Sequence, residues 1–248
     1  MSCIFGIDLL KYFISCEVRI IDILKDIWSC FDFSYLISIL ISVIPSLFCI
    51  SFHEFSHGLV AHWLGDDTAK NAGRLTLNPI KSLDITGLLM LIIFHVGWAK
   101  PVPVNMYKFK NPKRGMALTA LAGPLSNMLL AVVFIFLYGF FYVPCGESKL
   151  GEYVSEMLIL GGYMSIGLAI FNLIPVPPLD GSKVLFSFLS NEKYYKLMRY
   201  EKYFSIIMIV LVATGLIGKP LSRAIYDTLN ALTPVADSAC SLYLKLFR

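Results

Sequence analysis

Residues Phe33 to Leu64 form an apolar run in which Glu54 is the only charged side chain. A helix of about 20 apolar residues crosses the hydrocarbon core of a bilayer, so this run is long enough to span one. The whole chain is 57% apolar and only 15% charged, whereas a soluble domain carries roughly 25% charged residues. The sequence therefore predicts an integral membrane protein surrounded by a lipid bilayer.

Four further apolar runs follow this first one. Two are long enough for spans, at Met116–Pro144 and Tyr153–Pro178. The run at Tyr203–Gly218 is borderline, and the run at Ile85–Ala99, of about fifteen residues, is shorter than the roughly 20 that a span needs. We expect four to six membrane segments in all.

The flanking regions differ from this central part because apolar and charged residues alternate in them. Residues 1–33 carry a charge every few positions among apolar side chains, a pattern typical of an amphipathic helix at the membrane interface. We expect an amphipathic N-terminal segment at 1–33, a membrane domain at 34–218 and an amphipathic C-terminal tail at 219–248.

The loop charges predict the orientation of the spans. Basic residues concentrate in 70–81, 100–114 and 180–202, whereas 144–153 contains more acidic than basic residues. The positive-inside rule places the three basic loops in the cytoplasm and the acidic loop outside. Because the net charge of +4 is modest and its basic residues lie in loops, it indicates membrane orientation and no nucleic-acid partner.

Both flanks of Ile85–Ala99 are then cytoplasmic, so a single crossing cannot connect them. A re-entrant segment enters and leaves the membrane on the same side, and so it can connect two cytoplasmic flanks. Its irregular backbone is tolerated if protein or a water-filled cavity covers it. The following stretch, Gly97–Asn105 (GWAKPVPVN), carries two prolines that exclude a helix and favour an extended edge. We therefore expect an all-α polytopic membrane protein with a short re-entrant or β-hairpin element on its cytoplasmic side.

The strongest chemical signal is the HExxH motif His53-Glu54-Phe55-Ser56-His57. Positions i and i+4 share one face of a helix, so both imidazoles can reach one metal ion. Glu54 is then placed to take a proton from a water that zinc activates. An acidic side chain at mid-membrane costs about 2.5 to 3.5 kcal/mol, which marks a functional site. The alternative interpretation is a polar helix face that lines a bundle.

Two histidines leave a tetrahedral zinc ion without a third protein ligand. Asp180 is the best candidate, at the end of the stretch NLIPVPPLDG (Asn172–Gly181), where prolines break the fourth apolar run and Gly181 permits a close turn. The alternative is that Asp180 and Gly181 form a surface turn. We expect one Zn²⁺ ion per chain.

The motifs HEFSH, GPLSN (Gly123–Asn127) and NLIPVPPLDG have the order and relative spacing of the site-2 protease family of intramembrane zinc metalloproteases, which the chain resembles over roughly 40–185. It is most similar to compact bacterial members without a PDZ or CBS domain. The resemblance implies that His53, His57 and Asp180 bind zinc, that Glu54 is the general base, and that two asparagines assist. Asn172 matches the asparagine proposed to steady the substrate or the oxyanion, and Asn127 matches that of the GPxxN segment. Alternatively, each asparagine caps or bridges helices.

The expected function follows from this resemblance. It implies hydrolysis of a peptide bond in or near a transmembrane segment of a membrane-anchored protein, in a bacterial cell membrane, with the active site near the cytoplasmic side. The stretch GWAKPVPVN is expected to pair with an unwound substrate by strand addition. The alternatives are a prenyl-protein type of protease, which takes a downstream glutamate as third ligand, and a non-proteolytic membrane metal-binding protein or transporter. The sequence leaves the oligomeric state open.

Overall fold

The computed structural model describes residues 33–82, 100–145, 148–200, 203–204, 208, 210–211 and 214–247. The predicted N-terminal amphipathic segment, apart from Phe33, and the predicted re-entrant run Ile85–Ala99 lie outside these residues. The chain divides into two compact units, residues 1–40 and 41–248, and everything that follows on packing concerns the second.

Among the described residues, three helices contain stretches that are long and apolar enough to cross a membrane: α2 (Phe33–Trp63), α6 (Pro112–Cys145) and α7 (Lys149–Leu173). The other described helices are α3 (Thr68–Asn71), α4 (Pro79–Ser82), the 3-10 turn η1 (Met106–Lys108), α8 (Asp180–Ser187), α9 (Asn191–Arg199) and the long α11 (Gly218–Phe247). No strand occurs among the described residues. The prediction of an all-α membrane protein is therefore confirmed at this level, whereas a β-hairpin and four to six spans are not established.

The boundaries of α2 and α7 follow from local chemistry. The side chain of Ser148 accepts a hydrogen bond from the N–H of Gly151 at 3.1 Å, which caps the start of α7. At the end of α2, Gly65 adopts a positive φ of 101° and its N–H bonds to the His62 carbonyl, a conformation that glycine adopts without steric cost. α7 ends at Leu173, just before the prolines at 175, 177 and 178.

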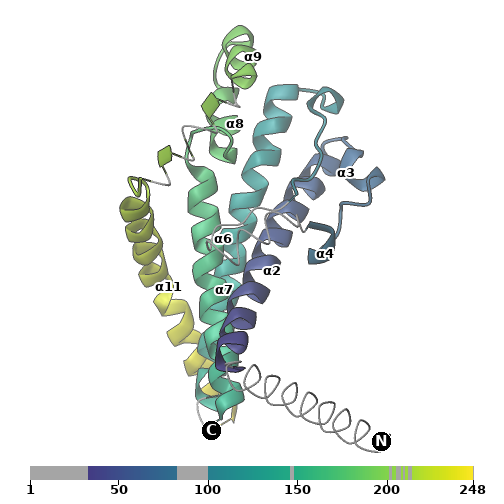
Figure 1. Ribbon diagram of the computed structural model, residues 1–248. Helices are drawn as coiled ribbons and strands as arrows, with labels where there is room; N and C mark the ends of the chain where they lie inside the picture. The colour runs from purple at the N-terminus through teal and green to yellow at the C-terminus, as the bar shows by residue number, and fades with distance from the viewer. Residues whose placement is uncertain are drawn as a thin grey trace, which may run out of the picture. The chain divides into compact units, whose positions relative to one another are not determined.

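Helix α6 is central to the second unit, because it contacts α7, α8, α11 and η1. Figure 1 shows α6 and α7 running side by side, with α11 along them. Their shared core consists of Ala131 and Ile135 of α6, Ile166 of α7 and Ile225 of α11, all buried. This packing fixes α6 as the support against which the elements of the site are held.

The corner between α7 and α8 places Asp180 as the first residue of α8. Gly181 allows this corner to be tight, since a Cβ atom there would collide with the backbone carbonyl of Leu173 at the end of α7. The close approach of the two helices therefore requires a glycine, and it holds the Asp180 carboxylate at a defined place beside α6.

Candidate metal centre

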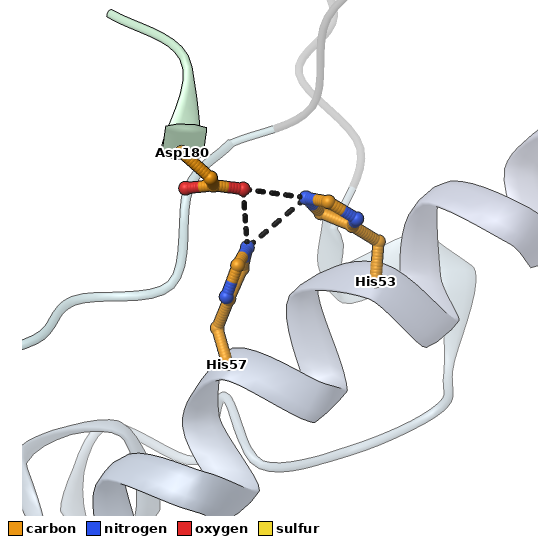
Figure 2. A group of neighbouring side chains, drawn as sticks. All are labelled: His53, His57 and Asp180. Carbon is orange, nitrogen blue, oxygen red and sulfur yellow. Dashed lines mark hydrogen bonds and ion pairs between the residues drawn. The ribbon is translucent and has the colours of Figure 1, made fainter. Parts of the chain in front are cut away.

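Three buried side chains from α2 and α8 converge on one point (Figure 2). His53 Nε2 and His57 Nε2 each lie 3.1 Å from Asp180 Oδ2 and 3.0 Å from each other. The two imidazoles come from consecutive turns of α2, as the HExxH spacing predicts. The structure therefore brings together all three side chains that the sequence nominated as metal ligands.

The donor chemistry of this group fits a cation. His57 Nδ1 lies 2.6 Å from the backbone carbonyl of Thr119, which can only accept, so Nδ1 donates. In a neutral imidazole the Nε2 atom then carries a lone pair, and here it faces the Asp180 carboxylate, also an acceptor. A cation removes this repulsion. Two imidazole nitrogens and one carboxylate oxygen, with a fourth position open, are a donor set that catalytic zinc takes.

Each of the three side chains also has a second contact that restrains its orientation. His57 is held by the Thr119 carbonyl, and His53 Nδ1 lies 3.5 Å from the side-chain amide of Asn127. Asp180 Oδ1 lies 3.3 Å from Lys183 Nζ, which leaves Oδ2 directed to the histidines. Such outer contacts orient metal ligands, and their loss typically lowers metal affinity about 10- to 100-fold.

The same contacts set the charge of Asp180. Burial alone would raise the pKa of Asp180, but the close imidazoles of His53 and His57 and the positive charge of Lys183 hold this pKa well below its usual range. Asp180 is therefore ionised at neutral pH, as a metal ligand must be.

Gly123, the first residue of the GPLSN motif, packs directly against both imidazoles. A Cβ atom at this position would lie 2.5 Å from Cε1 of His53 and 2.5 Å from Cε1 of His57. Real Cβ atoms do not approach other atoms so closely, so the histidines would have to move. The glycine of this motif is thus a spatial requirement of the candidate metal centre.

The centre opens into a cavity of about 390 Å³, within the range of ligand pockets. Its lining includes the three candidate ligands, Glu54, Asn172 and, from the stretch before η1, Pro101, Val102 and Val104. Glu54 is partly buried, and its Oε2 atom accepts a hydrogen bond from the backbone N–H of Val102 at 2.8 Å. The predicted general base therefore lies at the same cavity as the candidate ligands.

The two predicted asparagines occupy different places. Asn172 lines the cavity, and its side-chain N–H donates to the carbonyl of Leu168 one turn earlier in α7, at 3.0 Å. Asn127 is fully buried on α6, where it contacts His53 and where its backbone carbonyl accepts from Ser165. Only Asn172 is thus positioned beside the space that a substrate can enter.

Sequence reasoning missed several residues that shape this site: Asp66, Val102, Thr119 and Lys183. Two of them act through backbone atoms, which carry no signal in the sequence. Lys183 follows Asp180 at a spacing of three in a helix, and this spacing could have nominated it as a partner of the carboxylate.

Comparison with known proteins agrees with this geometry. The family model of peptidase family M50 matches residues 39–217. The chain is 36% identical over 212 residues to YwhC of Bacillus subtilis, a match that covers 83% of this chain and 92% of the relative. It is 35% identical over 161 residues to MJ0611 of Methanocaldococcus jannaschii, covering 62% of this chain and 76% of the relative. It is 29% identical over 184 residues to Rip2 of Mycolicibacterium smegmatis, covering 73% of this chain and 69% of the relative. All three are named as zinc metalloproteases. No solved structure matches the chain.

Proposed function

Because the chain belongs to peptidase family M50, the site-2 protease type of intramembrane zinc metalloprotease, we propose that His53, His57 and Asp180 hold its zinc ion and that Glu54 is its general base. The observation that carries this assignment is the convergence of the two Nε2 atoms and Asp180 Oδ2 at 3.0 to 3.1 Å beside a cavity that Glu54 lines. The activity itself, zinc-dependent hydrolysis of a peptide bond in a protein substrate, follows from membership of the family.

When bound, zinc supplies the Lewis acidity that lets water attack a peptide carbonyl near neutral pH. Residues of the chain transfer the proton, stabilise the developing charge and orient the ligands. Glu54 takes the proton of the attacking water on its carboxylate and returns it to the leaving amine. Asn172 steadies the negative charge that develops on the carbonyl oxygen, because its amide lines the cavity. Asn127 is fully buried, and we assign it the task of orienting His53.

The substrate is a membrane-anchored protein, cut in or near its transmembrane segment. The site lies on an apolar helix that is long enough to span a bilayer. A membrane-embedded segment of another protein can therefore reach the site most directly. The non-helical residues Lys100–Asn105 line the cavity in part and offer an edge to an unwound peptide. Pro101 and Pro103 have no N–H to donate, so pairing at these two positions would use their carbonyls as acceptors.

The active site faces the cytoplasm of a bacterial cell. The ends of α2 and α6 nearest the site adjoin the basic loops 70–81 and 100–114, which the positive-inside rule places in the cytoplasm. A short re-entrant or β-hairpin element on this side stays a prediction for Ile85–Ala99, which lies outside the described residues. The protease domain is 34–218, with four to six membrane segments, flanked by amphipathic segments at 1–33 and 219–248.

The experiment is cleavage of a model transmembrane substrate in proteoliposomes by the wild type and by Glu54→Gln. We expect one cut in or near the transmembrane segment, mapped by mass spectrometry, and a loss on the order of 100- to 10,000-fold in the variant. Cleavage by Glu54→Gln at the wild-type rate would refute the assignment of the base. The alternative of a non-proteolytic metal-binding protein or transporter is not favoured, since the matched relatives are named as proteases.

A further inference from the structure

The extended stretch beside the cavity makes a specific contact with the proposed general base. The backbone N–H of Val102 donates to Glu54 Oε2 at 2.8 Å, across 48 positions of sequence. We propose that this backbone N–H is the positioning group that holds Glu54 in the orientation needed for proton transfer. The inference rests on the proposed function, because it assigns a role in the reaction that Glu54 performs there.

The sequence around Val102 makes its N–H the sole backbone donor of the three residues from Pro101 to Pro103, since proline has none. Proline also restricts the residue before it to an extended conformation, so Pro103 holds Val102 extended. Val102 itself is only 9% exposed. The donor is therefore rigid and shielded, as a positioning group must be.

A second carboxylate anchors the other end of the same stretch. The N–H of Asn105 donates to Asp66 Oδ2 at 2.6 Å, and Asp66 is fully buried. Asp66 in turn accepts from the N–H of Thr68 at 3.0 Å and pairs with Lys108 at 3.5 Å. The stretch from Val102 to Asn105 is thus pinned at both ends to residues of α2 and of the loop that follows it.

These two anchors constrain Glu54 in turn. A glutamate side chain has three rotatable bonds, and a freely rotating carboxylate would spend little time in one productive orientation. A hydrogen bond from a fixed backbone donor selects one orientation at the cavity wall, where Glu54 lies beside His53 and His57. The benefit is a better orientation of the base. In enzymes, a misplacement of a reacting group by about 1 Å can lower the rate on the order of 100-fold.

The opposite role is also testable. If the Val102 contact sequestered Glu54 until a substrate displaced it, removal of the donor would raise turnover. The two roles therefore predict opposite changes in kcat.

The test removes the donor in two ways. Val102→Pro deletes the N–H, and incorporation of the α-hydroxy analogue of valine at position 102 replaces the N–H by an ester oxygen while keeping the side chain. We expect both to lower kcat for a transmembrane substrate about 10- to 100-fold, with KM and zinc content close to those of the wild type. Val102→Ala keeps the N–H and should retain a clearly higher kcat than Val102→Pro. An unchanged or increased kcat in the ester variant would overturn the proposal.

A spectroscopic measurement makes the contact testable apart from activity. In protein labelled with ¹⁵N-valine, the Val102 amide resonance is identified by its loss in Val102→Ala. We expect this resonance to shift in Glu54→Gln, because a carboxylate is a stronger acceptor than an amide, and to stay in place in the exposed control Glu156→Gln. No shift in Glu54→Gln would refute the contact. Absence of cleavage by the wild type would count against the proposed function alone.

Discussion

His53 Nε2 lies 3.1 Å from Asp180 Oδ2, although the two residues are 127 positions apart in the sequence. His53 belongs to the long helix α2, and Asp180 begins the short helix α8. α8 packs on α6, and α6 also provides the Thr119 carbonyl that holds His57. The proposed metal centre is therefore a product of helix packing, and changes in α6 should affect it without altering any of the proposed ligands.

Gly123→Ala is the smallest such change. The added Cβ would meet Cε1 of both histidines at 2.5 Å, so the imidazoles must move. We expect zinc content and proteolysis to fall sharply while the helical content is kept. Zinc measured by mass spectrometry and far-UV circular dichroism of the purified variant check this.

The matched control is Gly167→Ala in α7. Its Cβ would lie 3.4 Å from the Ile225 side chain, an ordinary van der Waals distance, so zinc content should stay near that of the wild type. Full zinc occupancy in Gly123→Ala would show that the glycine is not needed for the geometry of the histidines.

Asn127→Leu tests the orientation of His53. Asn127 Oδ1 is buried and lacks a hydrogen-bond partner within the described part of the chain, while Nδ2 lies near His53 Nδ1. Turning the amide over places Oδ1 against the Nδ1–H of a metal-binding imidazole and satisfies both groups. We expect about 10- to 100-fold weaker zinc binding in competition with a chelator. If Asn127→Leu bound zinc as tightly as the wild type and the exposed control Asn230→Leu do, the assignment would be contradicted.

Lys183→Met tests the restraint on Asp180. The lysine lies 3.3 Å from Oδ1, and methionine keeps much of its length without the charge. The freed carboxylate should bind zinc more weakly, by about 10-fold, with a parallel loss of activity at limiting zinc. Lys193→Met, an exposed lysine of α9, provides the comparison. Equal zinc affinities of the two variants would rule out this role for Lys183.

The buried Asp66 predicts a dependence of stability on pH. Burial alone would raise the pKa of Asp66, but hydrogen bonds from Thr68 and Asn105 and the charge of Lys108 hold this pKa below its usual range. A carboxyl whose pKa is lowered by folding stabilises the protein above its unfolded pKa of about 3.9. This contribution is lost as the pH falls through the lower folded pKa.

Thermal unfolding in detergent between about pH 3 and pH 7 checks this prediction. We expect Asp66→Asn to be less stable than the wild type near neutral pH, by about 1 to 3 kcal/mol, since weakened bonds to buried donors cost about that much. The difference should shrink on acidification. If the stability of the two proteins changed with pH in the same way, Asp66 would be excluded as the source of the pH dependence.

Much of the chemistry could be predicted from the sequence, because side chains carry it. The HExxH spacing places His53 and His57 on one helix face, and the structure brings Asp180 to them. The apolar runs predicted both α6 and α7, although α7 ends at Leu173, short of the predicted Pro178. The reason is that prolines are uncharged and so do not interrupt an apolar run of sequence, whereas they do end a helix.

The supporting contacts could not be predicted in this way. The bonds from the N–H groups of Val102 and Asn105 to Glu54 and Asp66 use the backbone, which every residue has. The role of Gly123 depends on which helix packs over the histidines, and a single glycine within an apolar run does not reveal that. The sequence therefore identifies candidate reacting side chains, whereas the contacts that hold them in place depend on tertiary packing.

The most direct measurement is the zinc stoichiometry of detergent-purified wild type, Asp180→Ala and Glu54→Gln, with cleavage of a transmembrane peptide followed in the same samples. The wild type should contain one zinc ion per chain and cleave the peptide. Asp180→Ala should lose both properties, and Glu54→Gln should keep zinc and lose cleavage, because a base does not hold the metal. Full zinc occupancy and normal cleavage in Asp180→Ala would contradict the account at its centre.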